Sequence, residues 1–326
     1  MPIAFPAGAF PAESSFEPVI SPDGQLLVLN GNTPLPFIRA PFTDEPPPPL
    51  FAVRFGTSKF AQIRFAPSVP LAGVVAAVLP GSRAVQVGTA ATAFATILNA
   101  GSGTATGCSI APTNAPTGTT FSYQQTNAAN VPIGQPNTPA TIPGGNGQSF
   151  VISLTPTAAF PATDIQFAFA CANTSAVAVL PGVNTLLLTS TSAPGPDIVA
   201  LAATVTNDGI ANIPPGVFGT GFFSVATVNV GASAQITASV DTGSVSLPIA
   251  PALCQTNPGT GACLEPTVLS TSTTVQINAG QTPTFAVFVV GLGNVAVNPG
   301  VNRVFVRFKT AGGATVGATS VAIRTQ

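Results

Sequence analysis

The sequence contains no histidine and no tryptophan, and only 6% of its 326 residues are charged, against about a quarter in an average soluble protein. Without imidazole, Ser-His-Asp and Cys-His catalysis, His-ligated zinc and His proton shuttles are all excluded. We therefore expect a protein that is not an enzyme and that uses neither a cofactor nor a metal ion.

Positive charge is especially scarce. The chain has 9 Lys and Arg against 10 Asp and Glu, a net charge of -1, and residues 84–302 contain neither Lys nor Arg. Binding to nucleic acid depends on clustered cations that displace counterions from the phosphates. We expect no nucleic-acid partner.

Long hydrophobic runs are also missing, although the mean hydropathy is +0.48. Pro, Gly, Thr and Asn interrupt every apolar run before it reaches the ~18–20 residues of a spanning helix. The first residues lack the basic region and the continuous apolar region of a signal peptide. We expect no membrane span, and the residues leave open an upstream leader or another export route.

An internal repeat with a period near 130 residues organises most of the chain. Segment 94–101 matches 225–231 at an offset of 131 to 130, and segment 185–189 matches 319–323 at an offset of 134. The matches keep their order, which predicts one module at 72–195 and a second at 196–326, each of single-domain size. The polar residues that recur are Asn99 and Gly101 in the first module and Asn229 and Gly231 in the second.

Within both modules, short runs rich in Val, Ile, Phe and Thr alternate with polar residues, as at 150–154, 285–289 and 304–308. Alternation with a period of two is typical of strands. Pro- and Gly-rich turns separate the runs, and helix caps are absent. The pattern predicts an all-β chain of two tandem antiparallel β-sandwiches.

Residues 1–71 differ in kind, since the first 70 residues carry 14 of the 34 prolines and 9 of the 19 charges. We interpret 1–71 as a Pro-rich N-terminal arm. It contains a predicted β-hairpin, with strands at 51–55 and 60–65 joined by 56–59. Either the sandwiches or another copy of the chain would hold this arm in place.

Four cysteines allow three pairings, and the module boundary favours one bridge in each module. Cys108 with Cys171 would link the two sheets of the first sandwich, and Cys254 with Cys263 would close a surface loop. Four buried thiols in a cytosolic protein are the alternative. The even split favours an oxidising compartment, hence an extracellular or cell-surface location.

Two aspartates lie in motifs that have both a chemical and a structural interpretation. Asp241-Thr-Gly-Ser is similar to the active-site loop of aspartic proteases, but those enzymes need two facing carboxylates, which only a dimer of this chain would supply. Asp208-Gly209 has the oxygens for a calcium ligand but few acids around it. We interpret both as turns between strands.

The segment from Ala93 to Tyr123 resembles bacterial surface repeat domains of the CARDB and conserved-repeat type. Their pattern is an apolar strand, Asn-x-Gly, Ala-Thr, another strand and then Pro-x-Gly-x-x-Phe. The resemblance implies an Ig-like fold for both sandwiches and a role as a spacer or adhesion module of exported proteins, with no catalytic residues to transfer. The matching residues are Asn99, Gly101, Ala105, Thr106, Pro116, Gly118 and Phe121.

A surface with so little charge has little repulsion to keep copies apart. We therefore predict a non-enzymatic structural subunit of an extracellular filament or surface layer, a homo-oligomer or polymer in which the arm adds its strands to a neighbour's open sheet edge. The alternatives are a phage or virus structural protein, a monomeric adhesin or ligand-binding module, and a dimeric aspartic protease. The residues expected at the assembly interface are Phe51, Val53, Phe55, Phe60, Ile63 and Phe65.

Overall fold

The computed structural model describes residues 17–20, 26–31, 50–55, 59–64, 73–216, 218–265 and 269–326, and the chain divides into two compact units, Met1–Pro70 and Leu71–Gln326. The described residues form strands, turns and loops without any helix. A helix of the length and apolarity needed to cross a membrane is accordingly not found among them.

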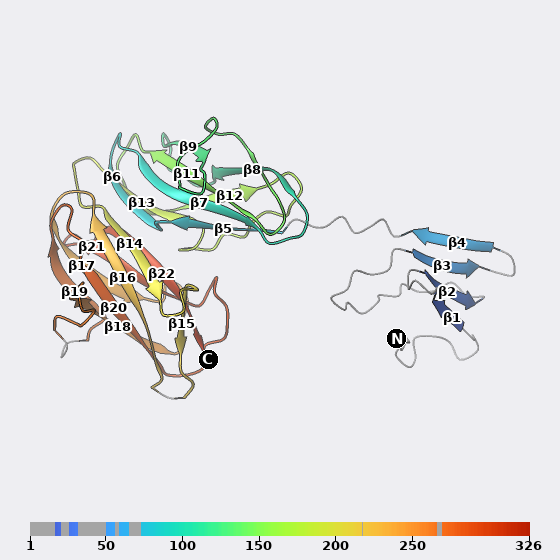
Figure 1. Cartoon of the computed structure of the whole chain (residues 1–326). Helices are drawn as coiled ribbons and strands as arrows, with labels where there is room; N and C mark the ends of the chain where they lie inside the picture. The colour runs from blue at the N-terminus through green and yellow to red at the C-terminus, as the bar shows by residue number, and fades with distance from the viewer. Residues whose placement is uncertain are drawn as a thin grey trace. The chain divides into compact units, whose positions relative to one another are not determined.

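The first sandwich contains nine strands in two sheets (Figure 1, cyan to green). One sheet has the order β5-β7-β11-β9, and the other has the order β10-β8-β12-β13-β6. The strands are β5 (Val74–Leu79), β6 (Ser82–Gln86), β7 (Ala91–Asn99), β8 (Ala105–Pro112), β9 (Thr120–Gln125), β10 (Ala140–Ile142), β11 (Gly147–Thr155), β12 (Phe160–Ala170) and β13 (Thr185–Thr191).

The second sandwich follows in the same unit (Figure 1, yellow to red). Its sheets have the orders β14-β16-β20-β18 and β15-β22-β21-β17-β19. The strands are β14 (Ile198–Thr204), β15 (Ile210–Ile213), β16 (Thr220–Asn229), β17 (Ala234–Asp241), β18 (Ile249–Thr256), β19 (Ser272–Ile277), β20 (Thr284–Gly291), β21 (Arg303–Thr310) and β22 (Thr315–Thr325).

The two sandwiches share one topology, because strands β5 to β13 correspond in order to β14 to β22. The predicted fold class of two tandem β-sandwiches is confirmed. The sheets are antiparallel except for one parallel pair in each sandwich, β6 with β13 and β15 with β22. In each sandwich a short connection follows the first strand and leads into the other sheet. The second strand, β6 or β15, then runs parallel to the last strand of that sandwich, β13 or β22.

The last strand of the repeat aligns one residue later than the sequence match indicated. Leu186 and Leu188 belong to the first core, and Val321 and Ile323 belong to the second, which makes the offset 135 and not 134. An offset of 134 would pair Leu186 with Ser320, which faces away from the core. A shift of one residue exchanges the two faces of a strand, so burial decides a register that similarity of composition left uncertain.

Each sandwich has its own core of Phe, Ile, Val and Leu between the two sheets. In the first, the Phe167 ring lies 6.0 Å from that of Phe169. In the second, the Phe285 and Phe308 rings from facing sheets lie 5.5 Å apart. Burial follows strict alternation on the central strands, as on β16 and β20, which is why the sequence pattern located them.

The N-terminal unit contains one sheet in the order β1-β2-β3-β4. Its strands are β1 (Glu17–Ile20), β2 (Leu26–Gly31), β3 (Leu50–Phe55) and β4 (Lys59–Arg64). Strands β3 and β4 pair antiparallel, with Phe51 opposite Ile63 and Arg54 opposite Phe60. The predicted hairpin is therefore present, and β2 adds to it in parallel.

Adjacent phenylalanines on β16 provide a matched test of this core. Phe223 is 1% exposed, whereas its neighbour Phe222 points outward and is 52% exposed. We expect Phe223→Ala to lower the free energy of unfolding by about 3–5 kcal/mol. Phe222→Ala should change it by about 0.5 kcal/mol or less. Denaturant unfolding of the non-reduced protein measures both values, and equal losses would contradict the alternation of faces.

Candidate interaction surfaces

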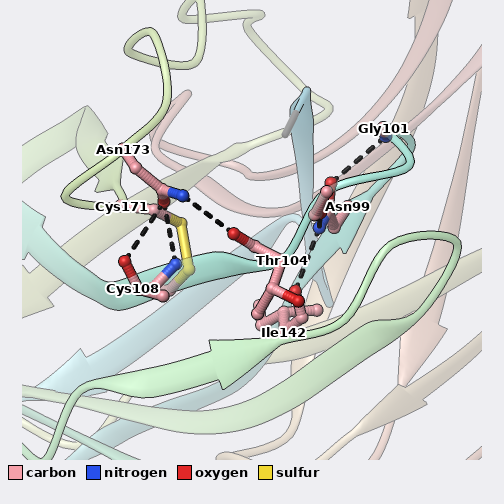
Figure 2. Close-up of a disulfide and its surroundings, with 9 residues drawn as sticks. Asn99, Gly101, Thr104, Cys108, Ile142, Cys171 and Asn173 are labelled. Carbon is pink, nitrogen blue, oxygen red and sulfur yellow. Dashed lines mark hydrogen bonds between the residues drawn. A yellow bond between two sulfur atoms is a disulfide. The ribbon is translucent and has the colours of Figure 1, made fainter. Parts of the chain in front are cut away.

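Cys108 and Cys171 form a disulfide within the first sandwich (Figure 2). Cys108 lies on β8, and Cys171 directly follows β12, which pairs with β8 so that Ala170 lies opposite Ser109. Continuing this register places the two cysteines opposite each other. The bridge therefore joins neighbouring strands of one sheet, and the expected link between the two sheets was wrong.

The polar residue Asn99 lies at the end of β7, with its side chain directed at the Ile142 backbone (Figure 2). Its buried amide donates to the carbonyls of Gly103 and Ile142, and its oxygen accepts the Gly101 N–H. Asn229 makes the corresponding bonds at the end of β16, with Ala232, Ile277 and Gly231. The repeated Asn-x-Gly motif is thus structural, because its asparagine side chain forms hydrogen bonds with backbone groups that would otherwise be buried without a partner.

The second disulfide joins Cys254 on β18 to Cys263 and closes the loop between them. Cys263 also forms an isolated bridge with Thr256, so the loop is held against the strand. All four cysteines are bonded. Two disulfides in one chain are typical of proteins of an oxidising compartment, such as the cell surface or the extracellular space.

Asp241 stabilises a turn and an ion pair at the end of β17. One carboxylate oxygen accepts the Gly243 N–H at 2.8 Å, and the Arg307 Nε lies 2.7 Å from the other oxygen. The Arg307 guanidinium also lies over the Phe305 ring, 4.8 Å from its centroid. Both oxygens of Asp241 therefore have structural partners.

Asp208 holds the turn between β14 and β15. Its carboxylate accepts hydrogen bonds from the Thr206 hydroxyl and the Ile210 N–H, and these bonds lower its pKa. In the parts of the chain that the structure describes, no three His, Cys, Asp or Glu residues gather as metal ligands. The turn interpretation accounts for both aspartate motifs.

The two sandwiches meet along β6, β13 and β22, and polar contacts fix them to each other. The Ser82 hydroxyl donates to the Ala318 carbonyl at 3.1 Å and accepts the Ala318 N–H. The Thr189 hydroxyl donates to the Thr315 carbonyl at 2.7 Å. Ala84 of the first sandwich packs in the core of the second. The junction is therefore a packed interface.

An ion pair lies in the middle of this junction. The Arg83 Nη2 is 2.9 Å from a carboxylate oxygen of Asp197, and the side chains are only 15% and 6% exposed. The other oxygen of Asp197 accepts the Ala84 N–H at 2.9 Å. Asp197 also donates its own N–H to Asn229. Asp197 thus connects β6 of the first sandwich to the Asn-x-Gly motif of the second.

The turn after residue 180 is the second point of close approach. The Ser320 hydroxyl of β22 donates to the Gly182 carbonyl at 2.9 Å. Gly182 has φ +73, and a Cβ on it would lie 2.7 Å from the Phe305 ring. A larger residue would be strained and would also push the sandwiches apart, so glycine is required here.

No motif in the sequence singles out these junction residues. Arg83 is the last cation before a stretch of 219 residues (84 to 302) that has none, and Asp197 lies at the predicted module boundary. An isolated cation and an acid at a boundary were the available signal. Only the fold brings them together.

Charge is absent from one sheet of each sandwich. None of the eight strands of the sheets β5-β7-β11-β9 and β14-β16-β20-β18 contains a charged residue. Large apolar side chains point outward from them, among them Leu79, which is 56% exposed, and Phe222. Leu79 lies opposite Phe94, and Phe222 lies opposite Phe288. Exposed apolar sheet faces of this kind are typical of interaction surfaces.

A pocket of about 320 Å³ lies where the two uncharged sheets approach each other at the junction. Phe94 and Val151 line it from the first sandwich and Val199 from the second, and Arg83 contributes one polar group. The pocket links the two apolar faces. Apolar side chains of both sandwiches therefore border it.

The residues predicted at the assembly interface belong to the N-terminal unit. The backbones of Phe51, Val53 and Phe55 lie in β3, and those of Phe60 and Ile63 in β4. Their side chains, and the whole of Phe65, lie outside the described residues. Their role at an interface stays a prediction.

Comparison with known proteins identifies no family, since no family model and no curated protein matches the chain. The solved N-terminal domain of PorA is similar with a TM-score of 0.25 and 11% identity, over 39% of this chain and 97% of that one. Domains 4–9 of the surface layer protein SbsC have a TM-score of 0.24 and 11% identity, over 84% of this chain and 34% of that one. The collagen adhesin from S. aureus has a TM-score of 0.20 and 10% identity, over 79% of this chain and 93% of that one.

Removing the acid at the junction tests how strongly the ion pair holds the sandwiches. Asp197→Ala leaves Arg83 without its partner in a largely buried position, so we expect a loss of about 3 kcal/mol in the free energy of unfolding. Asp208→Ala, in an exposed turn, should cost clearly less than Asp197→Ala. Denaturant unfolding compares the two, and equal costs would contradict a stabilising role of the pair.

Asp164 on β12 provides a pH test. Burial raises the pKa of its carboxyl, although the Thr185 hydroxyl and the charge of Arg307 act in the opposite direction. A raised pKa in the folded state means that ionisation weakens folding, so stability falls as the pH rises through the unfolded and then the folded pKa. We expect Asp164→Asn to be more stable than the parent at pH 7 and equal to it below about pH 3. Urea unfolding at both pH values measures this, and a gain that persists in acid would rule out ionisation as the cause.

Proposed function

We propose that the protein is a non-enzymatic structural subunit of an extracellular filament or surface layer. It assembles through its N-terminal arm and through sheet edges. The observation that carries this proposal is the absence of charge from eight strands that form one face of each sandwich. Such a face offers apolar area without charges that would have to be desolvated in a contact.

The junction supports the same function. The Arg83–Asp197 pair and the hydrogen bonds of Ser82 and Thr189 hold the two sandwiches in one arrangement. A subunit with a fixed internal geometry can repeat a contact at a constant angle, which ordered assemblies need. The two disulfides add stability outside the cell, where thiols are oxidised.

The junction pocket favours one second candidate, a cell-surface adhesin or ligand-binding module. Its lining is mostly apolar, with Phe94, Val151 and Val199, so a ligand would present an apolar group. The two functions differ in one respect, since an adhesin binds its ligand as a monomer, whereas a structural subunit binds copies of itself.

Deletion of residues 1–70 tests the proposed assembly. We expect the full chain, non-reduced, to form ordered fibres or sheets in negative-stain electron microscopy and the shortened chain to form none. Circular dichroism should show that the shortened chain keeps the β-structure of the two sandwiches, because both cores lie in the unit Leu71–Gln326.

A variant that retains residues 1–70 shows whether assembly needs the contact made by the arm or only the presence of the arm. Val53→Asp places a charge within β3 of the arm and should also prevent ordered assembly. Ordered assemblies of the shortened chain would refute the role of the arm. Single two-lobed particles of the full chain would favour the adhesin.

A further inference from the structure

The sandwiches protect most of their sheet edges with their own chain. The edge strand β9 is covered by the loop that follows it, in which Ile133 donates its N–H to the Gln125 carbonyl and Asn137 donates to the Tyr123 carbonyl. Backbone groups on these edges are thereby satisfied. A strand from outside would find them already occupied.

The corresponding strand β18 is covered in the same way. Leu253 donates its N–H to the Ser270 carbonyl at 2.8 Å, and Leu264 donates to the Gln255 carbonyl at 2.9 Å. The disulfide between Cys254 and Cys263 fastens this segment to the strand. The edge of β18 is closed.

Edges near the junction are closed by packing. Val78 of β5 donates its N–H to the Val183 carbonyl. The edge strand β14 packs closely against β22. A Cβ at Gly317 of β22 would lie 2.5 Å from the Ile198 carbonyl oxygen of β14. Strand β6 contacts the second sandwich through Ser82.

Strand β15 lies against β16, since a Cβ at Gly221 would be 2.6 Å from the Asn212 carbonyl oxygen. At its end the Ile213 carbonyl accepts the Gln326 N–H. The two remaining edge strands are β10 and β19, which occupy equivalent positions in the two sandwiches.

Strand β19 is the open edge, and hydrogen bonds identify which of its groups are free. Val240 donates its N–H to the Thr271 carbonyl at 2.9 Å, which makes this a hydrogen-bonded pair. The register with β17 then makes Thr273 and Val275 hydrogen-bonded residues as well, because such pairs alternate. The N–H and C=O groups of Thr274 and Gln276 therefore point away from the sheet.

A side-chain contact supports this alternation. The hydroxyls of Thr237 and Thr274 lie 2.9 Å apart across the ladder, as is typical of the closer, non-hydrogen-bonded pairs. Within the described residues, no group donates to or accepts from the outward backbone groups of Thr274 and Gln276. These groups are available to another strand.

The composition of β19 does nothing to discourage such pairing. Its six residues, STTVQI, include no charge and no proline, and its register with β17 has no shift. By contrast, β10 has three residues and a register shift, and its Ile142 carbonyl is bonded to Asn99. Charges, prolines, bulges and shortness are the usual protections of an edge, and β19 has none of them.

We propose that β19 of one copy pairs antiparallel with β19 of a second copy about a two-fold axis at Thr274. The contact joins two five-stranded sheets into one of ten strands. Thr274 would face Thr274 of the partner subunit, and Ser272 would face Gln276 of the partner subunit. No charges oppose each other in this pairing, and β-branched residues pack well across it.

This contact rests on the proposed structural function and gives it a second interface. A two-fold contact closes at a dimer, because each copy offers the same patch to the other. Propagation then requires a different contact, one that leaves β19 to its partner, and the arm supplies it away from this edge. Paired subunits linked by arms would extend in one or two dimensions.

Amide hydrogen exchange of the full chain, measured residue by residue, tests the pairing directly. We expect the amides of Thr274 and Gln276 to exchange at least tenfold more slowly as the protein concentration rises from dilute to associated. Those of Thr273 and Val275 should be protected at every concentration, because they are bonded to β17. Unprotected Thr274 and Gln276 in associated protein would overturn the proposal.

Substitution at the two-fold axis provides the second test. Thr274→Lys places two lysines opposite each other in the dimer, and we expect the dimer dissociation constant to rise at least tenfold in sedimentation of the full chain. Thr274→Pro removes the outward N–H and should act alike. Thr141→Lys, at a position on β10 that is also exposed, is the matched control and should leave the constant unchanged. An unchanged constant in Thr274→Lys would overturn the proposal even where Thr274→Pro fails to fold.

The two interfaces fail in different ways. Assembly that is lost on deleting the arm, together with an unprotected β19, would refute the edge contact alone. A protected β19, together with undiminished assembly of the shortened chain, would refute the arm alone.

Discussion

The carboxylate of Asp197 is the interaction on which the arrangement of the two sandwiches depends. It accepts hydrogen bonds from Arg83 and from the Ala84 N–H of the first sandwich, while its own backbone is bonded to Asn229 of the second. Because both side chains of the pair are largely buried, solvent screens them little. The segment that connects the sandwiches is therefore part of a packed interface. The uncharged faces and the edges keep a fixed relation to one another.

Charge is distributed unevenly between the two sheets of each sandwich, and this asymmetry gives the molecule its chemical character. Within the two sandwiches, the strands with charged residues, such as β12, β17 and β21, all belong to the five-stranded sheets. The four-stranded sheets of the sandwiches have none and carry apolar residues on both faces. One face builds the core, and the other carries exposed apolar side chains such as Leu79 and Phe222.

The repeat preserves its framework and changes its edges. Asn99 and Asn229 make the same three kinds of hydrogen bond in the two sandwiches, because the buried end of a long strand must be satisfied in each. Strands β10 and β19 occupy the same place but differ in length and protection. Framework residues are constrained by burial in both copies. Edge residues are less constrained, so the edge strand β19 of the second sandwich differs from β10 of the first in length and sequence.

The sequence by itself determined the all-β class, the two repeated sandwiches and the hairpin of the arm, because alternation with a period of two directly reflects which side of a strand is buried. It located the central strands with their phenylalanines for the same reason. The tertiary structure alone decided that the Cys108 bridge lies within one sheet, that the last strand aligns at an offset of 135, and that Arg83 meets Asp197. These facts depend on which strands become neighbours. Pairing between segments distant in the chain leaves no periodic trace in the sequence of either partner.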